Sequence, residues 1–295
     1  MRDEFERRDF LKLAALGGGV VFTAGLGLPA SAAPREDFTF LQITDTHWGF
    51  DGPKVNPEAK TTLKRAVDAV NALPIEPDFI MFTGDLTHTT EDPGERRRRL
   101  AEFRQIVGGI RHKNLRFMPG EHDAALDRGE AYREFFGAHY YTFDHKGLHF
   151  IAVDNTTDPG ASLGRTQLDW LAADLAQLDR DQPIVVFAHR PLYDLFPEWD
   201  WATRDGEAAL ALLAPYRHVT VFYGHIHQEH HRTVGQIGHH AAASLIFPLV
   251  AAGSQPKRGP VAWDPEKPFR GLGFRRVDAP AAAPPRLTEL PLVAG

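Results

Sequence analysis

The sequence contains no cysteine among its 295 residues. This absence excludes disulfide bonds, thiolate metal sites, cysteine nucleophiles and a lipid anchor on cysteine. The chain also lacks an excess of positive charge, because 33 Lys and Arg residues face 39 Asp and Glu residues, a net charge of −6. Non-specific nucleic-acid binding depends mainly on neutralising phosphates, so we expect no nucleic-acid binding. The one dense basic cluster, residues 96–99, lies among acidic residues and is typical of a solvated helix face.

A long apolar run is missing as well. The N-terminal apolar stretch, residues 13–28, is short and rich in glycine, whereas a spanning helix needs about 20 apolar residues. Arg7 and Arg8 precede this stretch, and the small residues Ala30-Ser31-Ala32 follow it. Residues 1–32 therefore resemble a twin-arginine (Tat) export signal without folded structure, cleaved near Ala33. The resemblance implies the Tat machinery as a partner of the precursor, a periplasmic or secreted location, and no stable membrane anchor; an uncleaved anchor is the alternative.

The remaining chain is rich enough in apolar residues to fold around a large core. Hydrophobic residues make up 43% of the chain and charged residues 24%. No linker divides residues 33–295, so we expect a single domain with a loose tail from about residue 279 that holds at most an edge strand.

Short apolar runs alternate with segments of helical periodicity, and β structure dominates later in the chain. This order predicts an α/β sandwich with mixed sheets. We expect helices at 57–73, 95–107, 167–178 and 207–213, and strands at 38–43, 79–83, 115–118, 140–144, 148–154, 184–188, 219–223, 229–234 and 245–250.

Polar side chains that could carry chemistry follow five of the predicted strands, at the point where each strand ends. The carboxyl ends of parallel strands open onto one crevice, so these side chains should meet there. Glycine precedes three of them, at Gly84, Gly120 and Gly224, where it permits a sharp turn and close approach of the backbone. The set comprises Asp45, His47, Asp85, His88, Glu121, His122, Asp123, His189, His225 and His227.

The order of these short motifs resembles the calcineurin-like metallophosphoesterase superfamily. The motifs are DTH at 45–47, GDLTH at 84–88, GEHD at 120–123, AH at 188–189 and GHIH at 224–227, and the resemblance runs from about 38 to 255. It implies an α/β sandwich of two mixed sheets flanked by helices, and a binuclear-metal hydrolase of a small phosphate ester. The implied metals are two divalent ions such as Mn, Fe, Zn or Co.

The resemblance also implies residue roles. Asp45, His47, Asp85 and His227 would hold the first ion. Asp85 would bridge to the second ion, which Glu121, His189 and His225 would complete. His122 would stabilise or protonate the leaving oxygen, and Asp123 would orient the His122 ring. For His88 we favour support of the site over direct binding of metal.

Glu121 departs from the family pattern, which usually has Asn at this place. Two divalent ions facing three carboxylates would leave a formal charge of about +1, whereas an Asn site would keep about +2. Our hypothesis is that the lower charge weakens the attraction for a dianionic monoester and favours a monoanionic diester or a more highly charged metal. The alternative is that Glu binds with little effect.

Residues that follow the ligands are candidates for substrate contact. Trp48, Tyr193 and Arg190 should rim the crevice, although the aromatic residues here are equally consistent with a packed lid, and Arg190 with an ion pair to Asp194. The motifs most resemble those of bacterial cyclic-nucleotide phosphodiesterases, so we favour a phosphodiesterase over a phosphatase acting on monoesters, and a protein phosphatase less still. A metal-stabilised binding protein without catalysis is the alternative.

Overall fold

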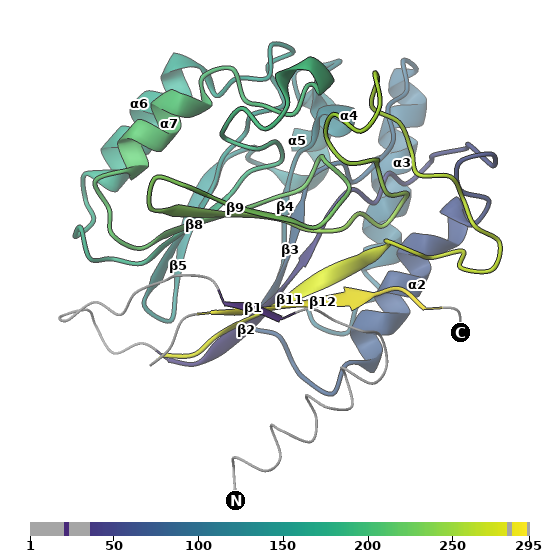
Figure 1. Cartoon of the computed structure of the whole chain (residues 1–295), viewed down its shortest axis with the longest axis horizontal. Coiled ribbons are helices and arrows are strands. Elements are labelled where there is room, and N and C mark those ends of the chain that lie inside the picture. Colours follow the sequence, from purple (N-terminus) through teal and green to yellow (C-terminus); the bar gives the residue numbers. More distant parts are fainter. Residues whose placement is uncertain (1–20, 24–35, 282–284, 294–295) are drawn as a thin grey trace, which may run out of the picture.

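Two mixed β-sheets face each other in the structure, a computed structural model that describes residues 21–23, 36–281 and 285–293. Within this part of the chain each sheet has six strands, in the orders β1-β12-β11-β2-β3-β4 and β5-β6-β7-β8-β10-β9. Helices cover the outer faces of both sheets, as Figure 1 shows for α6 and α7 on one side and α2 on the other. The predicted α/β sandwich of two mixed sheets flanked by helices is confirmed.

Each sheet combines parallel and antiparallel strands; the parallel strands lie at one end of the first sheet and in the middle of the second. In the first sheet the parallel strands are β2 (Phe38–Ile43), β3 (Phe79–Thr83) and β4 (Leu115–Met118), joined by the antiparallel strands β11 (Gly273–Ala279), β12 (Arg286–Pro291) and β1 (Val21–Thr23). In the second sheet β6 (Leu148–Ala152), β7 (Ile184–Phe187), β8 (Val219–Tyr223) and β10 (Ile237–Ala241) are parallel, with β5 (Tyr141–His145) and β9 (His230–Val234) antiparallel at the edges.

Phenylalanine rings fill the space between the sheets. The rings of Phe40 and Phe79 stack with centroids 4.9 Å apart, and Phe150, Phe187 and Phe222 pack edge-on against them from the second sheet. Each such ring removes a large apolar area from water, and edge-to-face pairs add directional contacts. The interior therefore holds the two sheets, and the strand ends that carry the polar residues, in one fixed relation.

Four longer helices pack their apolar faces on the outer sides of the sheets. α2 (Ala59–Ala72) and α3 (Pro93–Val107) cover the first sheet, and α6 (Gly164–Leu175) and α7 (Gly206–Leu213) cover the second. The start of α3 follows from its sequence, because the Asp92 carboxylate accepts hydrogen bonds from the backbone N–H groups of Gly94 and Glu95. Two shorter helices, α4 (Glu121–Ala124) and α5 (Glu130–Phe136), follow β4 and were not predicted.

Four corrections are needed in the C-terminal part of the chain. Leu245–Val250 is a loop rather than a strand, with a single bridge between Leu249 and Pro260. Pro248 lacks the N–H that a sheet requires. The strands at β10 and β11 were missed. The tail is not loose, since β12 pairs with β11 and its Leu287 is fully buried.

The N-terminal segment also differs in part from the prediction. Val21–Thr23 forms β1 and pairs with β12, whereas residues 1–32 were expected to lack folded structure. A sheet edge offers unpaired N–H and C=O groups to any extended segment nearby, which accounts for this pairing. The rest of the predicted export signal lies outside the described residues. Among the described helices, none has the length and apolar character needed to cross a membrane.

Candidate metal centre

Five of the seven predicted ligands sit on strained backbone directly after central parallel strands. Among the described residues, nine other than glycine have positive φ angles, and five of these are Asp45, His47, Asp85, His225 and His227. Left-handed backbone at such residues costs on the order of 1–3 kcal/mol each and persists only where the surroundings impose it. The backbone strain therefore lowers stability, and it turns these side chains toward one place.

Two glycines let the ligand loops approach each other. A β-carbon at Gly120 would overlap the carboxylate and backbone nitrogen of Asp85. One at Gly224 would overlap the Thr44 hydroxyl and crowd the Asp45 carboxylate. The close approach expected at these positions is confirmed, and it explains why no larger residue fits.

Four predicted ligands of the first ion lie together and are buried. His47 Nε2 is 3.1 Å from His227 Nε2 and 3.3 Å from Asp85 Oδ2. Asp45 Oδ1 lies 3.3 Å from His227 Nε2. These ligand atoms all lie within 4.8 Å of one another, which is the separation expected of atoms that share one ion.

A second group lies on the other side of Asp85. His189 Nε2 is 3.4 Å from Asp85 Oδ2 and 3.0 Å from Glu121 Oε2, while His225 Nδ1 is 2.8 Å from Glu121 Oε1. His189 Nε2 and Glu121 Oε2 are both buried and make no hydrogen bond despite facing each other. Buried polar atoms without partners are costly, and a cation between them would satisfy both. The residues present therefore fit a dinuclear centre in which Asp85 Oδ2 faces both groups.

The ring nitrogens that face away from the centre are held by carbonyl groups in three of the four histidines. His189 Nδ1 lies 2.7 Å from the Thr83 carbonyl, His225 Nε2 lies 2.9 Å from that of Asp200, and His227 Nδ1 lies 2.8 Å from that of Phe247. Because a carbonyl only accepts, each outer nitrogen carries the hydrogen and donates it. The inner nitrogen of each ring is then free to bind a metal ion.

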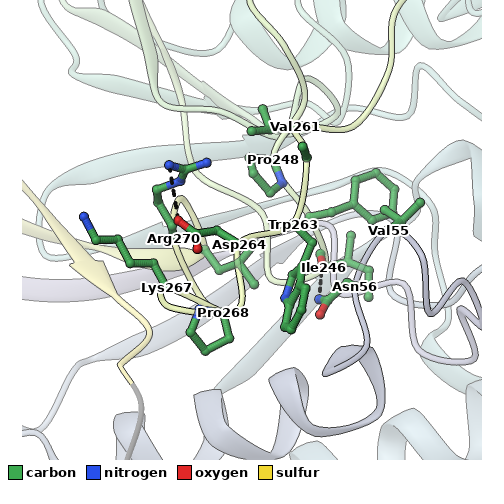
Figure 2. Close-up of a pocket in the computed structure, with 13 residues that line it drawn as sticks. Val55, Asn56, Ile246, Pro248, Val261, Trp263, Asp264, Lys267, Pro268 and Arg270 are labelled. Atoms are coloured by element: carbon green, nitrogen blue, oxygen red, sulfur yellow. Dashed lines mark hydrogen bonds and ion pairs between the residues drawn. The ribbon is translucent and has the colours of Figure 1, made fainter.

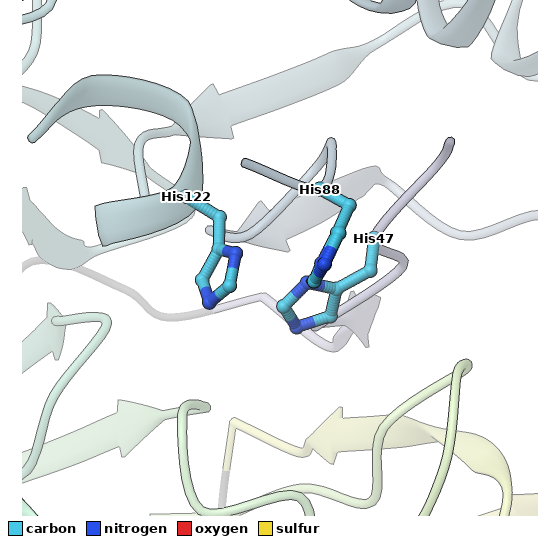
Figure 3. Close-up of side chains that lie close together, drawn as sticks. All are labelled: His47, His88 and His122. Atoms are coloured by element: carbon cyan, nitrogen blue, oxygen red, sulfur yellow. The ribbon is translucent and has the colours of Figure 1, made fainter. Parts of the chain in front are cut away.

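For the fourth histidine, His47, the acceptor of the outer ring N–H is His88 in place of a carbonyl group. The two Nδ1 atoms lie 3.2 Å apart, and the His88 ring also stacks on that of His122, as the three side chains in Figure 3 illustrate. Burial, and then the nearby His122, lowers the pKa of His88 to about 4, so His88 is neutral near pH 7 and its Nδ1 can accept the hydrogen of His47. The geometry thus matches support of a ligand, although His47, His88 and His122 also lie close enough to form a metal-sized group themselves.

Thr89, and not Asp123, holds the His122 ring. Thr89 donates its backbone N–H to His122 Nδ1 at 3.2 Å, and its hydroxyl lies 2.6 Å from the same atom. Since a backbone N–H can only donate, Nδ1 of neutral His122 accepts and Nε2 carries the hydrogen. Sequence reasoning missed Thr89, whose only signal was its place one residue after His88.

The expected contact between Asp123 and the His122 ring is wrong. The buried Asp123 carboxylate accepts hydrogen bonds from the backbone N–H groups of Leu86, Thr87 and Gly120 and from the Thr87 hydroxyl. Its position at the start of α4 directs the carboxylate back into the loop after β3. Asp123 therefore ties two ligand loops together.

Charges balance around the second group. Although burial opposes ionisation, His225 and Arg190 lower the pKa of Glu121 well below its ordinary value. Burial likewise opposes protonation of His189, yet the Asp85 and Glu121 carboxylates raise the pKa of that imidazole. The two carboxylates therefore attract positive charge to this place, as they would attract a metal ion.

The residues expected to contact substrate, Trp48, Tyr193 and Arg190, are instead engaged in contacts within the protein. Trp48 donates its indole N–H to Glu102 of α3 at 2.9 Å, and Tyr193 is buried with its hydroxyl 3.0 Å from that of Tyr223. Trp199 and Trp201 are buried as well, so the packed lid is the correct alternative for these aromatic residues. Arg190 pairs with Asp200 at 2.7 Å and not with Asp194.

Phe247 and Phe50 are the aromatic residues that do reach the centre. The Phe247 ring lies 4.9 Å from that of His227 and 5.1 Å from that of Phe50, which in turn packs on His88. Figure 2 shows a pocket beside this loop, lined by Pro248 and Trp263 among others. Its cavity volume of about 20 Å³ has room for little more than water and does not hold a substrate.

Fold and site together define a two-metal phosphoesterase, and comparison with known proteins places the chain in a family. Residues 38–229 match the calcineurin-like phosphoesterase family, and the chain belongs to it. A cAMP/cGMP dual specificity phosphodiesterase of Mycobacterium tuberculosis is 29% identical over 244 residues, which cover 77% of this chain and 74% of that protein.

Two solved structures share the fold. A purple acid phosphatase from yellow lupin superposes with a TM-score of 0.61 at 16% identity, covering 86% of this chain and 51% of that chain. A dimetal phosphatase from Danio rerio gives a TM-score of 0.54 at 15% identity, covering 87% and 99% respectively. This chain thus spans about half the length of the lupin protein and nearly all of the fish protein. The protein is a metal-dependent phosphoesterase that uses two divalent metal ions.

Proposed function

We propose that this protein is a phosphodiesterase whose two metal ions are held around Asp85 and which acts outside the cytoplasm. The observation that carries the proposal is the convergence of six other buried or half-buried ligand side chains around Asp85, with the ring of His122 beside them. Asp45, His47 and His227 would hold one ion with Asp85. Glu121, His189 and His225 would hold the other, again with Asp85. The ions would polarise the phosphate and lower the pKa of water to about 7.

His122 supplies the proton chemistry in this proposal. Its Nδ1 accepts from Thr89, so its Nε2–H is available to donate. The ring lies 4.6 Å from that of the ligand His47, edge to face. A donor held at this position can stabilise or protonate the oxygen that leaves from phosphorus. A binding protein without catalysis would have no need of an oriented donor beside its metal ligands.

The diester preference is supported by the named activity of the mycobacterial relative, a cyclic-nucleotide phosphodiesterase. The charge that Glu121 adds does not by itself support the preference, because Arg190 lies 3.6 Å from that carboxylate and offsets it. We therefore base the proposed preference for a diester on similarity to this relative, and the effect of Glu121 is a question for experiment.

The test is hydrolysis by the purified chain supplied with Mn, Zn, Fe or Co. Bis(p-nitrophenyl) phosphate and p-nitrophenyl phosphate present the same leaving group as a diester and a monoester. We expect turnover that depends on metal and is faster on the diester. His122→Ala should lower kcat by about 10²–10⁴-fold.

His112→Ala is the matched control, because His112 precedes β4 while His122 follows it, at opposite ends of the strand. This control should keep full activity. Preference for the monoester would overturn the diester proposal alone. Metal-dependent stabilisation without turnover of either ester would favour the binding protein.

We also propose that residues 1–32 direct Tat export and that residues 33–295 form one domain. The paired Arg7 and Arg8 support export. A chain carrying Lys at both positions should remain in the cytoplasm, and N-terminal sequencing of the exported protein should begin near Ala33. Export of the Lys variant, or an exported protein that keeps residues 1–32, would refute the proposal. Cleavage would remove β1 and leave β12 at the sheet edge.

A further inference from the structure

Glu121, the residue that departs from the family pattern, lies against a buried arginine. Arg190 Nη2 is 3.6 Å from Glu121 Oε1, and the Arg190 side chain is only 7% exposed. Burial alone would lower the pKa of the guanidinium, but Glu121 and Asp200 raise it. Charges at this depth are screened far less than surface charges, so Arg190 offsets part of the Glu121 charge while it also pairs with the Asp200 carboxylate at 2.7 Å.

The contact belongs to a closed set of four residues. Arg190 Nη1 donates to the Asp200 carbonyl at 3.0 Å, and the same carbonyl accepts from His225 Nε2 at 2.9 Å. His225 Nδ1 faces Glu121 Oε1 at 2.8 Å. Asp200 adopts left-handed backbone with a φ of 65° and lies between the buried residues Trp199 and Trp201. Glu121, His225, Asp200 and Arg190 therefore position one another.

We propose that Arg190 is the counter-ion that adapts the second metal position to a glutamate ligand. This inference rests on Glu121 being a ligand, as proposed above. Two divalent ions and the carboxylates of Asp45, Asp85 and Glu121 sum to about +1. The guanidinium, which also pairs with the Asp200 carboxylate at 2.7 Å, offsets part of the negative charge that Glu121 adds relative to a neutral Asn. Both terminal nitrogens of Arg190 are engaged by protein groups, so Arg190 is a positioning residue.

The pair should behave as a unit toward metal. Glu121→Asn removes a ligand charge and leaves the Arg190 cation opposed only by Asp200, so the Kd of the second ion should rise by about tenfold or more. Arg190→Met should leave the Kd unchanged or lower it, because the carboxylate then attracts metal without a competitor. The double variant should return to within about threefold of the original Kd, since it restores the charge balance.

The experiment uses the full chain and Mn²⁺. Ions bound per chain are counted by mass spectrometry of the desalted protein, the Kd of each ion is measured by calorimetric titration, and thermal unfolding without metal checks that every variant folds. Arg190→Lys keeps the charge and should bind like the original. Arg96→Met is the matched control, because Arg96, on α3, is equally buried but pairs with Asp127 at 2.8 Å.

A double variant that binds the second ion as weakly as Glu121→Asn would overturn the proposal. An Arg190→Met variant would overturn it too, if it had the same Kd as Arg96→Met and, like Arg96→Met, did not change the effect of Glu121→Asn on the Kd. An unaltered chain that binds fewer than two ions would instead refute the proposed dinuclear function, whatever the variants do. The two failures are therefore distinguishable.

Discussion

Replacement of Asp123 by Asn tests whether this residue shapes the site or takes part in catalysis. Oδ1 accepts from the Thr87 N–H at 2.8 Å and the Thr87 hydroxyl at 2.9 Å, while Oδ2 accepts from the N–H groups of Leu86 at 2.9 Å and Gly120 at 3.0 Å. Asn has one oxygen and one NH₂ group. The amide would place its NH₂ toward Thr87, where the hydroxyl can turn to accept and only one backbone N–H loses its partner.

The expected cost follows from these contacts. One buried donor without a partner costs about 1–3 kcal/mol. Burial and then Asp85 raise the pKa of Asp123 to about 7, and above that pH bonds to its charged carboxylate are roughly twice as strong as those to a neutral acceptor. We expect Asp123→Asn to lower the free energy of unfolding by about 2–4 kcal/mol. For a domain of this size that corresponds to a fall in Tm of roughly 5–15 °C.

Urea unfolding of the metal-free chain measures this loss directly. Asp68→Asn, on the exposed face of α2, is the matched control and should change the stability by less than about 0.5 kcal/mol. If Asp123→Asn were as stable as this control yet lost turnover, the structural interpretation would be refuted, and a direct part for Asp123 in catalysis would be restored.

Three further predictions concern the ligand loops and their surroundings. Gly120→Ala should abolish binding of both ions at equal Mn²⁺, because its β-carbon overlaps the bridging carboxylate, whereas Gly259→Ala, which meets no atom within 4 Å, should bind normally; equal metal content would disprove the steric argument. His88→Phe should weaken metal binding about tenfold by removing the acceptor for His47, and His88→Gln, which can still accept, should recover most of it in the same titration. Burial opposes ionisation of Asp154, but hydrogen bonds, led by that from His139, lower its pKa below the ordinary 3.8. The contribution of Asp154 to stability is therefore present above about pH 4 and is lost as pH falls through the lowered pKa. Asp154→Asn should reduce this loss of stability at acid pH in urea titrations, and an unchanged pH dependence would contradict the prediction.

Much of the fold was predictable because its signals are local. The apolar runs at Phe38–Ile43, Phe79–Thr83 and Val219–Tyr223 matched the observed strands residue for residue. The C-terminal strands were not predictable in this way. β12 has a polar, proline-flanked sequence, and it is a strand because β11 pairs with it and Leu287 reaches the core.

The candidate ligands were likewise visible in the sequence, since each follows a strand and the spacing of two residues presents both side chains of a pair together. Their partners were not visible. Thr89 meets His122 from 33 residues away, and the Phe247 carbonyl meets His227 across a loop that was mistaken for a strand. Such contacts depend on where loops of different strands come to lie.

By itself, the sequence determined the fold class, the family and the set of candidate metal ligands, because these follow from periodicity and from residue types at strand ends. The tertiary structure alone decided how the set is tuned. It paired Glu121 with Arg190 at 3.6 Å and directed Asp123 into the loop after β3. A charge acts through space on whichever group lies nearest, and the nearest group is chosen by packing and not by order along the chain.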